Sequence, residues 1–316
     1  MNALVLLVAA TCLTAGTQPS SYPNKPIRMV VGFPPGGGTD VVARILAPRM
    51  SELLGQPIVI ENLPGATGTV AAGQVAKSVP DGYTIMMGHV SVNAIAPALF
   101  SKLPYRAEDF APIALTAAVP HLIVIHPSVK AASLKELIAQ LKAVPDKTFP
   151  SAGNGSMPHM AGEIFKSLAG VQLLHVPYKG SGQSMQDLLG GRHLVAFDTM
   201  PASVPHVRSG KLRALAVSSS ARVPGMPDVP TAEEAGLPGY QVTTWYGLFA
   251  PAQTPPAIIH RLHAETVKAM RDLRDKLETV GSDGTVSRSP SEFASLVRED
   301  TARYAKLIKR LGLQID

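Results

Sequence analysis

The chain has 316 residues, 46% of them hydrophobic and 16% charged, a composition typical of a globular protein long enough to form two domains. Its formal net charge is +6, from 29 Lys and Arg against 23 Asp and Glu, and the basic residues are scattered along the chain. Nucleic-acid backbones require a concentrated basic patch, so this distribution argues against nucleic-acid binding. The single cysteine, Cys12, excludes an intrachain disulfide and a zinc cluster held by cysteines.

We expect residues 1–21 to be an export signal. An apolar run from Ala3 to Ala10 is followed by small residues, as in a secretory signal, and it is shorter than the roughly 20 apolar residues that span a membrane. No basic residue precedes the run, which is unusual for such a signal. Thr11 and Cys12 only loosely resemble a lipoprotein cleavage site, so lipid anchoring at Cys12 is the less favoured alternative. The sequence therefore predicts a periplasmic protein.

The first predicted element is a strand over Ile27 to Val31, which runs into a loop of prolines and glycines. In this loop Gly36, Gly37 and Gly38 carry no side chains, so a ligand can approach the backbone N–H groups directly. A helix from Asp40 to Leu54 follows, and its first turn adds unpaired donors and the positive end of a dipole. The arrangement suits a carboxylate, although a flexible turn is the simpler interpretation of an isolated glycine cluster.

A second copy of this pattern follows directly. A strand over residues 58–62 leads into a loop of small residues that contains Ala66, Thr67 and Gly68, and a helix is predicted from Thr69 to Lys77. Two adjacent loops without bulky side chains indicate a shared pocket. Pro48 lies inside the preceding helix, and because proline removes one helical hydrogen bond, we expect that helix to bend or split there.

The rest of the chain alternates predicted strands and helices, as in open α/β folds. Strands are expected over residues 83–87, 121–125, 173–176, 194–197, 212–217 and 243–250. Helices are expected over residues 134–144, 159–168 and 184–189, in a short helix capped by Thr231 and Glu234 and stopped by Gly236, from Thr254 to Leu277, and from Ser289 to about Gly312. Polar or glycine-rich segments follow several of the strands, at the edge where open α/β sheets bind ligands. These segments contain His89, Asn154, Ser156, Tyr178, Ser181 and Asp198.

The sequence contains no recognisable catalytic or metal-binding set. The motifs G-x-S-x-G and H-E-x-x-H, of serine hydrolases and zinc proteases, are absent. His159 and Glu163 are four residues apart on a predicted helix but lack a third ligand, so a structural role is the simpler interpretation. Asp40 is interpreted first as a helix cap and second as a ligand contact, whereas Asp198 fits a cap and a general base or ligand-amine partner equally well. We therefore expect no enzyme, no metal and no cofactor.

Five segments of the chain occur in the order found in one known family. They are Gly32-Phe33-Pro34-Pro35-Gly36-Gly37-Gly38-Thr39-Asp40, Glu61-Asn62-Leu63-Pro64-Gly65-Ala66-Thr67-Gly68, Pro177-Tyr178-Lys179-Gly180-Ser181, Pro230-Thr231-Ala232-Glu233-Glu234-Ala235-Gly236 and Trp245-Tyr246-Gly247-Leu248-Phe249-Ala250-Pro251. With these segments the chain resembles, from about Tyr22 onward, the Bug family, the TctC-type substrate-binding proteins of tripartite tricarboxylate transporters.

The resemblance implies a type II periplasmic binding fold, an α/β fold whose two domains close on a carboxylate like a Venus flytrap. Domain 1 would comprise residues 22–123 and 224–316, and domain 2 would be residues 124–223, inserted between them. Backbone N–H groups and bridging waters in domain 1 would hold one carboxyl group, at Phe33, Gly36, Gly37, Gly38, Thr39, Ala66, Thr67 and Gly68. The remaining half of the ligand would meet His89, Asn154, Ser156, Tyr178, Ser181 and Asp198.

The resemblance also implies a receptor without turnover, a monomer whose closed form meets the subunits of a membrane transporter. Asp198 would disfavour a second carboxylate nearby and would accept an amine, a hydroxyl or a bridging water instead. Two alternatives stay open: a binder of the same fold used in sensing or signalling, and an α/β enzyme that acts on a small acid. The identity of the acid is also left open.

Overall fold

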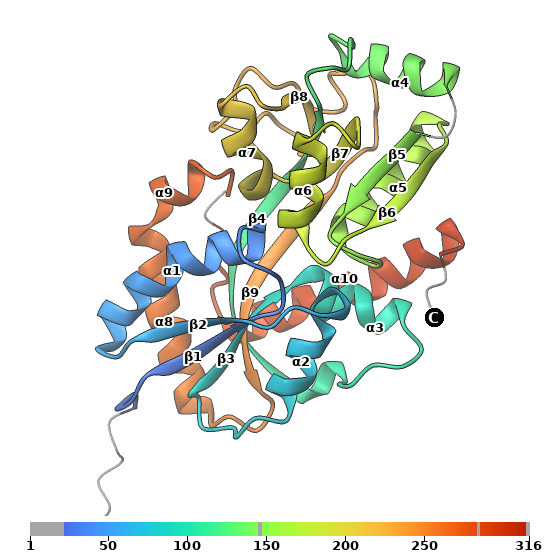
Figure 1. Ribbon diagram of the computed structural model, residues 1–316. Coiled ribbons are helices and arrows are strands. Elements are labelled where there is room, and N and C mark those ends of the chain that lie inside the picture. The colour runs from blue at the N-terminus through green and yellow to red at the C-terminus, as the bar shows by residue number, and fades with distance from the viewer. Residues whose placement is uncertain (1–21, 145–146, 283–284, 314–316) are drawn as a thin grey trace, which may run out of the picture.

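The computed structural model describes residues 22–144, 147–282 and 285–313, and the predicted export signal lies outside them. The protein has two lobes of mixed α/β structure, which lie one above the other in Figure 1. Lobe 1 contains both ends of the described chain, and lobe 2 contains its middle. Two long strands connect the lobes.

Lobe 1 is built on a mixed sheet. Its parallel strands are β1 (Ile27–Val31), β2 (Ile58–Asn62) and β3 (Thr84–His89), in the order β2-β1-β3. Next to β3 come β9 (Thr243–Pro251) and then β4 (Phe110–Ile125), each antiparallel to its neighbour. The helices are α1 (Gly38–Leu54), α2 (Thr69–Ala76), α3 (Ala96–Leu99), α8 (Pro256–Asp272), α9 (Arg274–Glu278) and α10 (Pro290–Leu311).

Lobe 2 is smaller and alternates strands with helices. Its elements are α4 (Leu134–Ala143), β5 (Lys147–Ser151), α5 (Met157–Ala169), β6 (Leu173–Pro177), α6 (Ser181–Leu189), β7 (Val195–Thr199), α7 (Met200–Arg208) and β8 (Arg213–Val217). β7 and β8 both pair antiparallel with β4, and β5 and β6 form a separate parallel pair. A single hydrophobic cluster includes buried residues of both lobes.

The long strand β4 joins the two lobes. Its residues 110–120 pair with β9, whereas residues 121–125 pair with β7 and β8. The prediction of a strand over residues 121–125 alone is therefore wrong, because the strand begins at Phe110. Pro112 and Pro120 lie inside it, and proline normally argues against a strand interior. The ladder is irregular between Pro112 and Ala114, which accommodates one of them.

The predicted helix ends are confirmed at two glycines and differ from the structure at two other places. Gly55, with φ of 71°, and Gly312, with φ of 64°, each end a helix in the left-handed conformation. The helix expected through Leu277 is divided at Leu273 into α8 and α9. The segment before Gly236 is a turn, because its reciprocal cap hydrogen bonds form but no helix continues from them.

Helix α1 runs without a break through Pro48, so the proline does not split the helix. An interior proline removes one hydrogen bond and costs about 3 kcal/mol. Leu46, Ala47 and Met50 are buried in the hydrophobic core of lobe 1, and this packing holds the helix together on both sides of the proline.

Replacing Pro48 with Ala should raise the free energy of unfolding by about 1 to 3 kcal/mol, because the lost helical hydrogen bond is restored at an exposed position. Urea denaturation followed by circular dichroism measures this. Pro256 lies at the first position of α8, where no such bond is needed, so Pro256→Ala is the matched control with little gain. Equal gains in the two variants would contradict the explanation.

Candidate ligand-binding site

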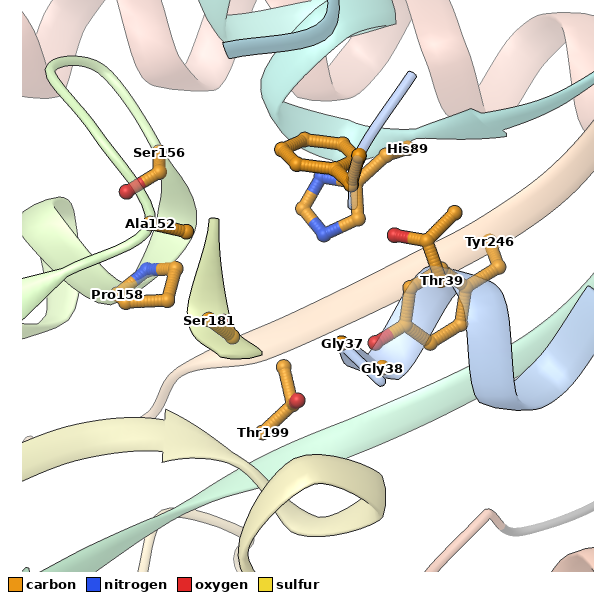
Figure 2. Close-up of a pocket in the computed structure, with 11 residues that line it drawn as sticks. Gly37, Gly38, Thr39, His89, Ala152, Ser156, Pro158, Ser181, Thr199 and Tyr246 are labelled. Carbon is orange, nitrogen blue, oxygen red and sulfur yellow. The ribbon is translucent and has the colours of Figure 1, made fainter. Parts of the chain in front are cut away.

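A closed cavity lies between the lobes, beyond the ends of β1 and β3. Its wall comprises Phe33, Gly37, Gly38, Thr39, His89 and Tyr246 from lobe 1 and Ala152, Ser156, Pro158, Ser181 and Thr199 from lobe 2 (Figure 2). The cavity encloses about 20 Å³, which is close to the room that one water molecule needs. The lobes are therefore closed on each other, and an organic ligand can enter only if they separate.

Four helices direct their N-terminal ends toward this cavity. The capping residues Gly37 of α1, Ser156 of α5 and Thr199 of α7 line it, as does Ser181, the first residue of α6. The first N–H groups of a helix have no partners within the helix, and the aligned peptide dipoles make this end partly positive. Among the described residues of the cavity wall there is no Lys or Arg. The site therefore favours an anion through backbone groups and not through charged side chains.

The glycine loop before α1 approaches both lobes closely. A Cβ atom on Gly38 would lie 2.3 Å from the Tyr246 hydroxyl and 2.7 Å from the Thr199 hydroxyl, so a side chain does not fit there. A Cβ atom on Gly37 would meet its nearest neighbours at 3.8 Å, an ordinary contact. Gly36 has φ of 84°, in the left-handed region that favours glycine. Space at Gly38 and backbone conformation at Gly36 thus explain two of the three glycines.

Asp40 holds this loop in place. Its carboxylate accepts hydrogen bonds from the Gly36 N–H at 3.0 Å, from Arg44 Nε at 2.9 Å and from the Asn62 amide at 2.9 Å. Burial by itself would raise the pKa of Asp40, but these hydrogen bonds, with that of Arg44 foremost, bring it below its ordinary value. The interpretation of Asp40 as the helix cap is wrong, because Gly37 occupies that position.

His89, the last residue of β3, is a neutral hydrogen-bond donor. Its ring lies between those of Phe33 and Tyr246, with centroid distances of 5.2 and 5.3 Å. Burial lowers the pKa of His89 to about 3, so the ring is uncharged at neutral pH. Its Nδ1 accepts the backbone N–H of Ser91 at 2.9 Å, which places the ring proton on Nε2. The Nε2–H group can therefore donate to a ligand in the cavity.

Tyr246 contributes an unsatisfied hydroxyl. It is paired with His89 across β3 and β9, and its buried hydroxyl makes no hydrogen bond of acceptable geometry to the described residues. Burial raises the pKa of Tyr246 despite an opposing effect of the nearby Thr199 hydroxyl, so the side chain stays a neutral phenol. Figure 2 shows its oxygen directed toward Gly38. A buried hydroxyl without a partner is costly, and a ligand acceptor would satisfy it.

Asp198 lies in β7 behind Ser181 and Thr199, which separate it from the cavity. Its Oδ1 accepts hydrogen bonds from the Thr199 N–H at 2.7 Å and from the Ser181 hydroxyl at 3.1 Å. Among the described residues, no hydrogen bond reaches its other oxygen, Oδ2. Burial raises the pKa of Asp198 to about 6, so part of the population is protonated in mildly acidic solution.

The remaining predicted residues lie away from the cavity wall. The hydroxyl of Tyr178 donates to Asp187 at 2.6 Å and lies 2.8 Å from His193 Nε2, within lobe 2. The Thr67 hydroxyl donates to the carbonyl of Asn154 at 2.7 Å, so this pair joins the two lobes. The others that do not line the closed cavity are Gly36, Ala66, Gly68 and Asp198.

Four residues of the wall were not predicted: Ala152, Pro158, Thr199 and Tyr246. Thr199 and Ala152 follow strand ends, so the rule that found Asp198 and Ser156 could have included them. Tyr246 lies inside β9, where the rule for residues at the C-terminal ends of strands does not apply. Its position depends on the pairing of β9 with β3.

The pair His159 and Glu163 has a structural role. His159 Nε2 and Glu163 Oε1 are 3.9 Å apart, and His159 Nδ1 accepts the backbone N–H of Gly155. Within the residues that the structure describes, no group of three or more His, Cys, Asp and Glu could hold a metal ion. In the same residues, each helix is too short or too polar to cross a membrane.

Replacing Asp198 with Asn should stabilise the protein above about pH 6 and leave its stability unchanged below about pH 4. The pKa of Asp198 is raised from 3.8 to about 6, so ionisation of the buried carboxyl destabilises the fold as the pH rises through this window. The expected gain at pH 8 is about 1 to 3 kcal/mol, measured by denaturant unfolding at both pH values.

Asp187→Asn is the matched control for this pH dependence. The hydrogen bond from Tyr178, followed by the contribution of Arg192, lowers the pKa of Asp187. Its ionised form therefore contributes stability that is lost as the pH falls, and Asp187→Asn should destabilise the protein at pH 8. A gain at pH 8 in both variants would contradict the assignment of Asp198.

Comparison with known proteins identifies the family. Residues 42–313 match the tripartite tricarboxylate transporter family receptor. Protein BugT of Bordetella pertussis is 36% identical over 315 residues, which cover 98% of this chain and 96% of BugT. The resemblance to the Bug family that the sequence predicts is thereby confirmed.

Two solved structures with similar sequences confirm the fold. Rpa4515 of R. palustris with adipate is 34% identical, with a TM-score of 0.90 over 93% of this chain and 99% of that one. MatC of Rhodopseudomonas palustris with bound malate is 38% identical, with a TM-score of 0.85 over 91% of this chain and 100% of that one. The chain therefore belongs to the tripartite tricarboxylate transporter receptor family and is a solute-binding protein with the two-lobe α/β fold of that family.

Proposed function

We propose that this protein captures a small carboxylate between its lobes in the periplasm and presents it to the subunits of a membrane transporter. The observation that carries the proposal is the convergence of four helix N-termini on a cavity whose wall has no described Lys or Arg. Neutral donors at His89 and Tyr246 complete a site that offers hydrogen bonds to an anion. The protein acts as a monomeric receptor, without catalysis.

One carboxyl group of the ligand binds to the lobe 1 loops. The proposed contacts are Phe33, Gly36, Gly37, Gly38, Thr39, Ala66, Thr67 and Gly68, and those on the closed cavity wall are Phe33, Gly37, Gly38 and Thr39. The other half of the ligand is proposed to meet His89, Asn154, Ser156, Tyr178, Ser181 and Asp198, of which His89, Ser156 and Ser181 line the cavity. The remaining contacts require movement of the lobes around the ligand and, for Tyr178 and Asp198, movement of side chains within lobe 2.

Asp198 restricts the acids that fit. Its buried carboxyl carries negative charge above about pH 6 and would repel a second carboxylate at short range. A ligand hydroxyl, an amine or a bridging water can instead donate to the oxygen that Ser181 and Thr199 leave unused. The solved relatives hold malate and adipate, which makes small dicarboxylates with a hydroxyl or a long spacer the first candidates.

Opening takes place where the chain crosses between lobes. We propose that domain 1 comprises residues 22–123 and 224–316 and that domain 2 is residues 124–223. This division is supported by β4, which changes its partners from β9 to β7 and β8 between residues 120 and 121. A ligand that contacts both domains binds the closed form more tightly and shifts the population toward it.

A thermal-shift screen tests the proposal. The chain is purified, freed of carried-over ligand as judged by mass spectrometry, and tested with malate, adipate, other small acids and their amides. An acid at a hundredfold excess over its dissociation constant should stabilise the protein by about 2.7 kcal/mol. Its amide should not, because the anion is lost. A panel of acids without any shift, or equal shifts with acids and amides, would contradict carboxylate binding.

Replacing Tyr246 with Phe should have opposite effects on stability and binding. Removing the unsatisfied hydroxyl should raise the free energy of unfolding of the free protein by about 1 kcal/mol. Affinity for the acid found in the screen should fall about tenfold, or about 1.4 kcal/mol, because a hydrogen bond is lost. Denaturation and calorimetry measure the two effects.

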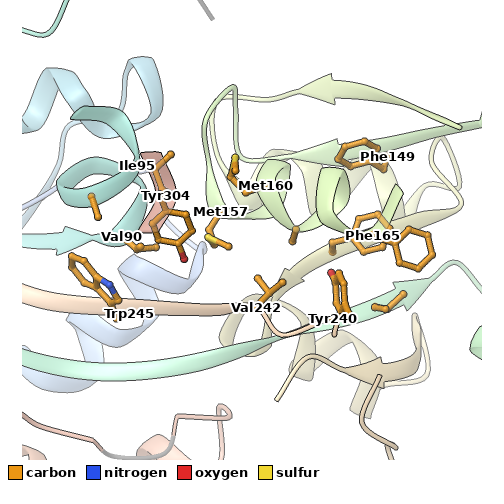
Figure 3. Packing of buried hydrophobic residues seen from close by; sticks show 14 of the residues in the cluster. Val90, Ile95, Phe149, Met157, Met160, Phe165, Tyr240, Val242, Trp245 and Tyr304 are labelled. Carbon is orange, nitrogen blue, oxygen red and sulfur yellow. The ribbon is translucent and has the colours of Figure 1, made fainter. Parts of the chain in front are cut away.

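Tyr240→Phe is the matched control for Tyr246→Phe. The Tyr240 hydroxyl is also buried without a partner among the described residues, but it packs near Phe165 in the hydrophobic cluster that includes residues of both lobes and does not line the cavity (Figure 3). This variant should gain similar stability and keep its affinity. Unchanged affinity in Tyr246→Phe would show that the Tyr246 hydroxyl does not bind the ligand.

A further inference from the structure

The two lobes share few direct hydrogen bonds near the cavity, and one of them is buried. The Ser91 hydroxyl, in a residue only 1% exposed, accepts the backbone N–H of Met157 at 2.8 Å. The other, from Thr67 to the carbonyl of Asn154, lies at an exposed position where water competes for it. Ser91 belongs to lobe 1 and Met157 to lobe 2, so this bond exists only when the lobes are closed.

On the lobe 1 side, Ser91 fixes a residue of the cavity wall. Its backbone N–H donates to His89 Nδ1 at 2.9 Å and thereby keeps the ring proton on Nε2. The backbone N–H of His89 is in turn bound by the Asn93 side chain at 3.1 Å. Ser91 and Asn93 lie in a single π-helical turn, Ser91–Ile95, a conformation that often marks functional sites.

On the lobe 2 side, Ser91 accepts a hydrogen bond from a backbone N–H group in the first turn of helix α5. Met157 is the first residue of α5, so its N–H has no partner within the helix. Ser156 caps the same helix through the His159 N–H, and Ser156 and Pro158 line the cavity. The Met157 side chain lies near Tyr304 of lobe 1 in Figure 3, and both residues border one groove between the lobes.

We propose that Ser91 is a positioning residue that couples lobe closure to ligand binding. The same residue orients the His89 donor toward the ligand and binds the first turn of α5 when the lobes close. Opening the lobes transfers the Met157 N–H to water, so the bond adds to the stability of the closed form only. This inference rests on the proposed function, in which the ligand is held by both lobes.

Replacing Ser91 with Ala removes the bond to Met157 and leaves the backbone N–H that holds His89. The experiment uses the full chain with Cys12 replaced by Ser and with spin labels on cysteines introduced at Val79 of lobe 1 and Leu174 of lobe 2. These residues are 69% and 65% exposed. The distance between the labels distinguishes open from closed molecules. Without ligand, the ratio of the open to the closed population should rise about fivefold to tenfold in Ser91→Ala, as expected for the loss of one buried hydrogen bond.

Two further variants keep the test decisive. Ser203→Ala is the control, because Ser203 is buried in α7 and its hydroxyl has no partner among the described residues, so the distances should not change. Ser91→Cys has nearly the same volume and a weaker acceptor, and should give an intermediate shift. If Ser91→Ala and Ser91→Cys both match Ser203→Ala, the coupling is overturned.

Ligand kinetics provide the second measurement, with malate and adipate as the probes. The dissociation rate should rise about fivefold to tenfold in Ser91→Ala, because the bond to Met157 forms after the ligand enters, and the association rate should not fall, because the open form is more populated. A purely structural role would lower the melting temperature and leave the dissociation rate of the folded fraction unchanged, which would also overturn the inference. Failure of both acids to bind the unmodified chain would contradict their assignment as ligands, and the distances measured without ligand would still decide the role of Ser91.

Discussion

Helix N–H groups without intrahelical partners are the constraint on which this cleft depends. Buried donors need acceptors, and four helix ends meet at one cavity. The protein supplies some acceptors itself: Ser91 accepts from Met157, and Asp198 accepts from Thr199. The first turn of α1 lacks a side-chain cap, because a glycine, Gly37, occupies the capping position. In the proposed function, an anionic ligand accepts hydrogen bonds from the N–H groups that remain at this cavity.

The two buried carboxyl groups near this site have opposite pKa shifts. Asp40 is held ionised by Arg44, the Gly36 N–H and Asn62, so its charge is neutralised and it shapes the glycine loop. Asp198 has hydroxyl and backbone donors but no cation, and burial raises its pKa to about 6. An acid kept in this state lowers stability at neutral pH, which is typical of groups retained for function. The two buried carboxyl groups therefore differ in charge at mildly acidic pH because their hydrogen-bond partners differ.

Local sequence patterns were sufficient to predict those helices and strands whose start and stop signals lie within a few residues of each other. The strand, the glycine loop and the helix that follows it were predictable between Ile27 and Leu54, as were the cap at Ser289 and the stop at Gly55, whereas the first residue of that helix was not. The length of β4 was not, because its two prolines are tolerated only through pairing with β9. Pro48 does not split α1, because core packing on both sides of the proline keeps the helix continuous.

The sequence by itself determined the family, the α/β class and the bare loops that follow strand ends, because each depends on short motifs and on residue types that set backbone conformation. Only the tertiary structure decided which loops share a cavity. It paired Tyr246 with His89 through strand register and directed Tyr178 toward Asp187 and His193. Partners of a polar side chain are chosen by geometry among residues far apart in the chain, and local periodicity carries no information about that choice.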